Sequence, residues 1–312
     1  MSLDEAAEQI RSGGVAAFPT ETVYGLGADA RNRDAIKEVF RLKARPADNP
    51  LIVHIADAEQ IRDFASDVPE AGLKLARKFW PGPLTMVFPK KPDVLDIVTG
   101  GLATVALRMP DHTLALELIR KTGPLVGPSA NKSGGPSPTK AEHVASDFGK
   151  EVVVLDGGPC ELGLESTVVR FDSNQITILR PGHIDPADLE KAGGLPVQYE
   201  QHDEKKPPQS PGTKYSHYSP RSEVKLASNL PDSFRKDALY LIIKEIEMDS
   251  ELPDNVIVYD GNLRLMAEEL YDRFRQADIH GYQNVVIVGL DTEDKSGLGR
   301  AVSNRIEKAA GV

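Results

Sequence analysis

Short apolar runs alternate with amphipathic segments along roughly the first 200 residues. Apolar residues recur every three or four positions and predict helices at 3–10, 35–40, 58–65, 69–79 and 114–121. Compact apolar runs predict strands at 15–18, 51–55, 84–88, 104–108 and 152–155. Two further runs, 166–171 and 175–180, flank a polar turn and predict a hairpin. Thr139 and Glu142 have the spacing of a capping box and predict a helix towards Phe148.

This order of elements predicts an α/β domain with a mixed sheet over residues 1–200. Between 201 and 220 the composition changes to Lys, Pro, Gln and Ser, as expected of a linker. Strands at 238–243, 256–259 and 284–288 and helices at 263–276 and 298–310 follow. We therefore expect a second, smaller Rossmann-like α/β domain with parallel strands at 221–312.

Composition narrows the function classes. The chain has 312 residues, 40% of them hydrophobic and 27% charged, with a net charge of -10. Such acidity disfavours nonspecific binding to nucleic acid or to an anionic membrane surface. A single cysteine, Cys160, excludes an internal disulfide and a cysteine-based zinc cluster. Because there is no signal peptide and no apolar run of the ~20 residues that span a bilayer, we expect a soluble cytoplasmic protein.

The familiar catalytic motifs are missing. The sequence contains no G-x-x-x-x-G-K-[ST] phosphate loop, no G-x-G-x-x-G fingerprint and no G-x-S-x-G elbow. Its seven histidines show no metal-ligand spacing, so we predict no protein-held metal site. What remains is a set of polar loops at the ends of predicted strands, where binding residues tend to collect.

Two of these loops lie in the first 50 residues. Phe18–Gly27 carries three hydroxyl groups, one carboxylate and two glycines. Lys43–Pro50 carries two cations close to Asn49, which suits a polyphosphate ligand. The alternative for the second loop is a solvated helix end, where cations are common.

Charged residues inside apolar strands need partners. Arg108 ends the apolar run 104–108, and burying it is costly unless it pairs with a structural carboxylate or with a ligand carboxylate. His54, in a similar run, is either a core group or a ligand contact. The polar segment 127–139 is either an anion-binding loop before a helix or a flexible Ser/Gly linker. Glu165-Ser166 and Arg180 add more polar groups at strand ends.

Taken together, these segments resemble the YrdC-like threonylcarbamoyl-AMP synthases. The resemblance covers essentially the whole first domain, in order and spacing, through Phe18–Gly27, Lys43–Ile55, Phe79–Thr85, Ser129-Ala130-Asn131 with Ser137-Pro138-Thr139, Glu165-Ser166-Thr167 and Leu179–Gly182. The segment Ser210–Pro220, followed by a small α/β domain, is similar to the long, two-domain form of the family. Thr213 stands where many relatives have methionine.

The resemblance implies a twisted, mostly open YrdC-like sheet and a nucleotidyltransferase reaction. L-Threonine, bicarbonate and ATP, with Mg²⁺ accompanying ATP, would give L-threonylcarbamoyladenylate, pyrophosphate and water. A tRNA threonylcarbamoyl-transferase complex would then modify the adenosine beside the anticodon, and weak tRNA binding by this chain is a further expectation. The linker would fold over the cavity as a lid.

The family's ligand contacts map onto named positions of this sequence. The resemblance assigns to L-threonine the following residues: Thr22, His54, Arg108, Gly127 and Ser166. It assigns to ATP a second set: Arg45, Asn49, Thr104, Ser129, Ser137, Arg180 and Tyr215. Lys43 is a further phosphate candidate, so Lys43 and Arg45 are the predicted catalytic residues.

Two other functions compete with this one. An RNA-binding module would use the same basic cavity, but the net charge of -10 disfavours it. A carbamoyl-transfer domain of the hydrogenase-maturation type would carry additional acylphosphatase-like and cysteine-rich zinc segments. A chain with one cysteine does not contain such zinc segments.

Overall fold

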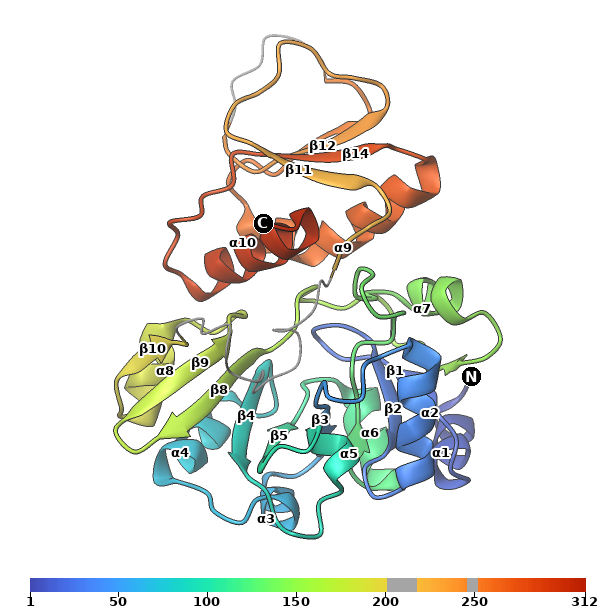
Figure 1. The fold of residues 1–312 in the computed structure, drawn as a ribbon, viewed down its shortest axis with the longest axis vertical. Helices are drawn as coiled ribbons and strands as arrows, with labels where there is room; N and C mark the ends of the chain where they lie inside the picture. Colours follow the sequence, from blue (N-terminus) through green and yellow to red (C-terminus); the bar gives the residue numbers. More distant parts are fainter. Residues whose placement is uncertain (201–217, 246–251) are drawn as a thin grey trace.

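A twisted ten-stranded mixed sheet forms the larger part of the protein (Figure 1). The computed structural model describes residues 1–200, 218–245 and 252–312. The sheet has the order β10-β9-β8-β4-β5-β3-β6-β2-β1-β7 and combines parallel pairs such as β3–β5 with antiparallel pairs such as β4–β5. Its strands are β1 (Ala16–Phe18), β2 (Gly25–Asp29), β3 (Ile52–His54), β4 (Leu84–Pro89), β5 (Thr104–Arg108), β6 (Leu125–Val126), β7 (Val153–Val154), β8 (Thr167–Asp172), β9 (Gln175–Arg180) and β10 (Val197–Tyr199).

Helices pack on this sheet and complete what we call the N-terminal domain, α1 to β10. They are α1 (Leu3–Arg11), α2 (Arg33–Lys43), α3 (Ile61–Phe64), α4 (Glu70–Phe79), α5 (Asp96–Thr99), α6 (Thr113–Thr122), α7 (Ala141–Phe148) and α8 (Pro186–Gly193), with a 3-10 turn η1 (Ala58–Gln60). Helix α2 shows how the sequence sets its ends. The Asn32 side chain accepts hydrogen bonds from the first free N–H groups, and Ala44 ends the helix in the left-handed conformation. Lys43, in the last turn, is thereby carried to the ends of the strands.

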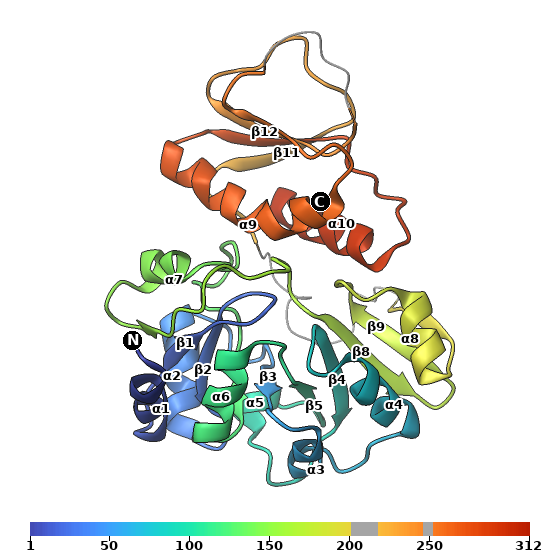
Figure 2. The same cartoon turned by 180° about the vertical axis from the view of Figure 1, so that it is seen from behind.

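A second sheet of four parallel strands forms the C-terminal domain, β11 to α10. Its order is β11-β14-β12-β13, and its elements are β11 (Glu223–Ala227), β12 (Ala238–Ile242), β13 (Val256–Val258), α9 (Leu263–His280), β14 (Asn284–Val288) and α10 (Gly297–Ala310). Both helices lie between this sheet and the N-terminal domain (Figures 1 and 2). The predicted fold class, a mixed open α/β sheet with a smaller parallel α/β domain, is confirmed.

Several local predictions were wrong or incomplete. The capping box at Thr139 does not form, because α7 begins after Lys140 and has no side-chain cap. Gly25–Gly27, predicted as the end of a loop, begin strand β2 (Gly25–Asp29). Strands β6, β10 and β11 are too short or too polar for apolar runs to reveal them. Of the predicted linker and lid, 201–220, residues 201–217 lie outside the described residues.

The two domains share one apolar cluster. Val23 and Leu164 of the N-terminal domain pack in the same buried cluster as Tyr271 of α9 and Val302 of α10. Removal of such side chains from water is the main favourable term in the association of protein surfaces. The C-terminal domain therefore packs in a defined position against the loops that leave the larger sheet.

Candidate active site

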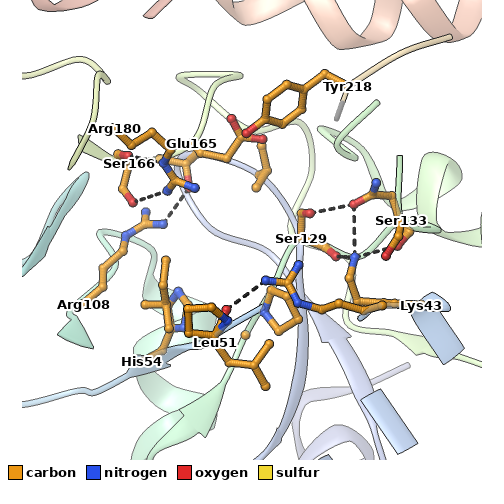
Figure 3. Close-up of a pocket in the computed structure, with 18 residues that line it drawn as sticks. Lys43, Leu51, His54, Arg108, Ser129, Ser133, Glu165, Ser166, Arg180 and Tyr218 are labelled. Carbon is orange, nitrogen blue, oxygen red and sulfur yellow. Dashed lines mark hydrogen bonds between the residues drawn. The ribbon is translucent and has the colours of Figure 1, made fainter. Parts of the chain in front are cut away.

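One pocket lies where polar loops of the N-terminal domain meet the C-terminal domain (Figure 3). It is lined by segments that are far apart in the sequence: Thr22, Val23, Lys43, Arg45, Pro50–Ile52, His54, Arg108, Gly127–Ser129, Asn131, Ser133, Glu165, Ser166, Arg180 and Tyr218. All five predicted threonine contacts belong to this lining. So do Lys43, Arg45, Ser129 and Arg180 from the predicted nucleotide set. The loops that looked independent in the sequence thus converge.

Arg108, at the end of β5, is fixed by three groups. Its Nη1 donates to Thr22 Oγ1 at 2.8 Å, and its Nε donates to the Gly82 carbonyl at 3.3 Å. Its Nη2 lies 2.6 Å from Glu21 Oε2, and both side chains are buried. The sequence left open whether Arg108 pairs with a structural carboxylate or with a ligand carboxylate, and Glu21 is the structural partner. Arg108 still lines the pocket and can also face a ligand carboxylate.

His54 and Gly127 form the floor beside Arg108. The His54 ring packs edge-on against Phe18, with 5.6 Å between ring centroids. Burial and, next, the charge of Arg108 lower the pKa of His54 to about 3, so the ring is neutral at neutral pH. A Cβ on Gly127 would lie 2.7 Å from His54 Nδ1 and 2.9 Å from Phe18 Cζ. Glycine is required there for steric reasons.

Ser166 links three strands at the neighbouring wall. Its hydroxyl lies 2.8 Å from Thr85 Oγ1 and accepts a hydrogen bond from Arg180 Nη2 at 3.0 Å. Arg180 Nε also donates to the Ser166 carbonyl at 3.1 Å. Arg180, predicted for ATP, and Ser166, predicted for threonine, are therefore held as one unit at the boundary between the two predicted subsites.

The Lys43 side chain donates hydrogen bonds to protein carbonyls, so it is not simply a group that waits for phosphate. Its Nζ donates to the Ser129 carbonyl at 2.5 Å and to the Asn131 carbonyl at 2.6 Å, and its side chain is buried. Burial and then the charge of Arg45 lower the pKa of Lys43 well below its usual range. Its Nζ thus joins the end of α2 to the 129–131 loop. This contact indicates a positioning role, in addition to the predicted contact with phosphate.

Arg45 projects into the same side of the pocket and is positioned by its own loop. Its Nη2 donates to Asn49 Oδ1 at 2.7 Å and to the Pro50 carbonyl at 2.8 Å. Asn49 is buried and does not line the pocket. Thr104 does not line it either; it lies two residues before the Ala106–Ile52 pair of β5 and β3, on the Pro50 side.

Glu165 is the one carboxylate among the described residues of the lining, and both domains contact it. It accepts a hydrogen bond from Ser137 Oγ at 2.6 Å, which explains why Ser137 is buried behind the pocket. From the C-terminal domain, Arg305 Nε donates at 2.9 Å and Tyr271 OH at 3.0 Å. Burial alone would raise the pKa of Glu165, but Arg305 and then Arg180 outweigh it and lower the pKa to about 2.

Tyr218, Tyr271 and Arg305 were not among the predicted site residues. Tyr218 lines the pocket, stacks on Tyr271 and has Arg305 near its ring face. It belongs to the Ser210–Pro220 segment that the resemblance singled out, but no feature of that segment distinguishes Tyr218 from Tyr215 as the pocket residue. Tyr215, the tyrosine that was predicted, lies outside the described residues. Arg305 and Tyr271 carry no local signal, because their partner is more than 100 residues away.

The charges in the lining indicate an anionic ligand. Among the described residues of the lining, four are basic, namely Lys43, Arg45, Arg108 and Arg180, and the single carboxylate is already bonded. Mg²⁺ prefers several oxygen ligands, so this donor set favours a metal carried by ligand phosphates over one held by the protein. Within the described ranges no group of three His, Cys, Asp or Glu could hold a metal ion. No described helix is long and apolar enough to cross a membrane.

Two sequence families match the chain. The family described as "Telomere recombination" matches residues 8–182, and "Threonylcarbamoyl-AMP synthase, C-terminal domain" matches residues 184–311. Among curated relatives, the threonylcarbamoyl-AMP synthase of Bacillus subtilis is 42% identical, over 98% of this chain and 92% of its own length. The one from Pyrococcus abyssi is also 42% identical, over 98% and 93%.

Solved structures agree with these relatives. The structure of P. abyssi Sua5 complexed with L-threonine superposes with a TM-score of 0.86 at 40% identity, covering 99% of this chain and 94% of that one. Escherichia coli YciO, at 21% identity and a TM-score of 0.52, shares the fold over 58% of this chain. On the full-length matches, the chain belongs to the threonylcarbamoyl-AMP synthase family, whose members are enzymes of the nucleotidyltransferase type.

Proposed function

We propose that this enzyme makes L-threonylcarbamoyladenylate from L-threonine, bicarbonate and ATP and releases pyrophosphate. The observation that carries the proposal is the convergence of four basic residues from three separate segments, Lys43 with Arg45, Arg108, and Arg180, on one pocket. A carboxylate and a triphosphate together need such a set, since each guanidinium can grip oxygens in pairs. The relative solved with L-threonine supports the choice of amino acid.

Threonine is placed at the Arg108 wall. Arg108 would bind the substrate carboxylate while Glu21 and Thr22 hold the guanidinium in position. His54 and Gly127 form the floor, and the Ser166 hydroxyl is available to the substrate's polar groups. Because His54 is neutral, it adds no charge that would repel the substrate ammonium group.

ATP is placed on the side of Arg45, Ser129 and Arg180, with Ser137, Asn49 and Thr104 in supporting positions. Mg²⁺ would arrive bound to the phosphates and offset part of their charge. Arg45 and Arg180 face the developing charge on the departing pyrophosphate, and Lys43 positions the 129–131 loop.

The reaction needs no covalent enzyme intermediate. The threonine amine takes up carbon from bicarbonate with loss of water, and a carbamate oxygen then attacks the α-phosphorus of ATP. The bond to the β-phosphate breaks, and its electron pair leaves with pyrophosphate. As in other phosphoryl transfers, the protein positions the reactants and neutralises charge.

The wider setting is also a proposal. Residues 1–200 would be the catalytic domain, 201–220 a linker and 221–312 a smaller domain. The product would serve a tRNA threonylcarbamoyl-transferase complex in the cytoplasm, which modifies tRNA beside the anticodon. Tyr215 remains a predicted ATP contact.

Product analysis tests the reaction directly. Purified enzyme is incubated with ATP, bicarbonate and labelled threonine, and pyrophosphate and labelled adenylate are measured together. We expect both products in equal amounts, and only when threonine and bicarbonate are present. Equal ATP turnover without threonine would exclude the proposal. Tight, salt-sensitive tRNA binding without any adenylate would favour the RNA-binding function instead.

A further inference from the structure

We propose that the C-terminal domain completes the nucleotide subsite through Arg305 and Tyr271, which are positioning residues that act on Glu165. This inference rests on the proposed function, because it takes the Ser137 side of the pocket as the ATP side. It gives the smaller domain a role in catalysis, although none of the residues described between β11 and α10 lines the pocket.

Glu165 lies on the loop before β8, and each of its oxygens is contacted from the other domain. Arg305 is fully buried, and its Nη1 also donates to the Pro181 carbonyl at 2.9 Å, next to Arg180. A single side chain of α10 therefore joins two loops that carry pocket residues.

Arg305 also balances the negative charge of Glu165. A buried carboxylate facing a triphosphate would repel it unless its own charge is balanced. Arg305 supplies that balance from behind, outside the lining, so the pocket keeps its net positive character. With the carboxylate ionised, both oxygens remain acceptors, and Ser137 is held in one orientation.

The C-terminal domain also holds a second loop beside the pocket, the segment that contains Ser137. Arg275 of α9 donates to the Pro136 carbonyl at 2.6 Å and pairs with Asp147 at 2.8 Å. Asp272, also of α9, contacts His143 at 3.0 Å and Lys140 at 2.9 Å. The chain on either side of Ser137 is thus held against α9 of the C-terminal domain. This places Ser137 next to Glu165.

The test compares full-length Arg305→Met, Arg305→Lys and Tyr271→Phe with the wild type. ATP affinity is measured by calorimetry, and KM for ATP and for threonine by threonine-dependent pyrophosphate release. We expect Arg305→Met to raise KM for ATP about tenfold or more, since it leaves a buried charge without its partner. KM for threonine should change less than about twofold, because the Arg108 wall is held within the N-terminal domain. Tyr271→Phe should raise KM for ATP about threefold, as expected for one lost hydrogen bond.

Controls separate positioning from folding. Arg305→Lys keeps the charge and should recover part of the ATP affinity. Tyr259→Phe removes a comparable hydroxyl whose recorded partners, Glu269 and Arg273, both lie within the C-terminal domain, and should leave both KM values unchanged. Glu165→Gln is measured alone and together with Arg305→Met. The rise in KM for ATP in the double variant should be smaller than the two single rises combined, because Arg305 is expected to act through Glu165.

Two results would overturn the inference. One is an unchanged ATP affinity in both Tyr271→Phe and Arg305→Lys, which preserve the packing if Arg305→Met does not fold. The other is an equal rise of both KM values, which indicates general loosening. If wild-type pyrophosphate release does not depend on threonine, the proposed reaction fails, while calorimetric ATP binding still tests the role of Arg305.

Discussion

Two buried carboxylate–arginine pairs flank the pocket, and they face it in opposite ways. In the pair of Glu21 and Arg108, 2.6 Å apart, the arginine lines the pocket and the carboxylate lies behind it. In the pair of Glu165 and Arg305, 2.9 Å apart, the carboxylate lines the pocket and the arginine lies behind it. The first pair lies within the N-terminal domain, whereas the second joins the two domains.

The comparison teaches how one pocket can offer two kinds of subsite. The partner that lines the pocket decides what each wall presents, and the partner behind it compensates the cost of burying that charge. Arg108 presents a guanidinium suited to a small carboxylate. Glu165 presents acceptors that hold Ser137, while its negative charge is offset by Arg305. Removing either partner that lies behind the lining should therefore weaken only one subsite.

The largest effect should come from Arg108→Met. This change removes the proposed threonine contact and leaves Glu21 buried without a counter-charge. We expect kcat/KM for threonine to fall about a thousandfold, which corresponds to ~4 kcal/mol. The free energy of unfolding should fall by about 3–5 kcal/mol, the usual cost of breaking a buried pair. Steady-state kinetics and urea unfolding measure the two quantities.

A double variant and a surface control sharpen this result. Glu21→Gln/Arg108→Met should regain most of the stability but none of the activity, because the uncompensated charge is gone while the ligand contact is still missing. Arg170→Met removes a half-exposed arginine of β8 that pairs with Asp172, outside the pocket lining, and should retain near wild-type kinetics. Full activity in Arg108→Met would mean that this wall does not bind the substrate.

The same comparison shows what the sequence could and could not predict. Strand β5 and the hairpin of β8 and β9 follow their apolar runs within a residue or so. Arg108 could be expected to have a partner, because a charge at the end of an apolar run must be paired. Which of the two kinds of carboxylate it pairs with was left open, and the structure identifies Glu21 as that partner.

The second wall could not be predicted, because its contacts connect distant parts of the chain. Nothing near Arg305 distinguishes it from other helix arginines, and only the packing of α10 brings it to Glu165. Strand β2 was missed for a similar reason. Its Gly25 and Gly27 have low strand propensity, and pairing with β1 and packing against Phe18 determine its conformation.

A smaller effect, confined to the first wall, should follow from Gly127→Ala. The new methyl group would press on His54 and Phe18, so the floor must shift by several tenths of an ångström. We expect KM for threonine to rise about tenfold and the free energy of unfolding to fall by about 1–3 kcal/mol. Gly135→Ala, in the same loop but with space around the new atom, is the matched control. An unchanged KM in Gly127→Ala would place threonine elsewhere.

The smallest effects should appear in the pH dependence of the free energy of unfolding. His54 of the first wall and Glu165 of the second lose their contributions in different pH ranges. The pKa of His54 is lowered to about 3 by burial and by the charge of Arg108, from 6.5 in the unfolded chain. The unfolded state therefore binds more protons between these values, so the contribution of His54 to stability is complete above pH 6.5 and is lost as the pH falls towards 3. The pKa of Glu165 is about 2, against 4.5 unfolded. Its contribution, set by Arg305, Arg180, Tyr271 and Ser137, is complete above pH 4.5 and is lost only below that.

Urea unfolding of the wild type and His54→Gln between pH 8 and 4.5 tests this separation. The difference in unfolding free energy should stay constant above pH 6.5 and then shrink with falling pH, by at most about 1.4 kcal/mol per pH unit, the limit for one proton. His183, whose pKa is also lowered, is present in both proteins and cancels. Threonine affinity of the wild type should vary less than about twofold between pH 6.5 and 8, because His54, with its lowered pKa, stays neutral there. A difference that is flat down to pH 4.5 would mean that His54 is not the buried neutral group of the first wall, and the contrast between the walls would then rest on their arginines alone.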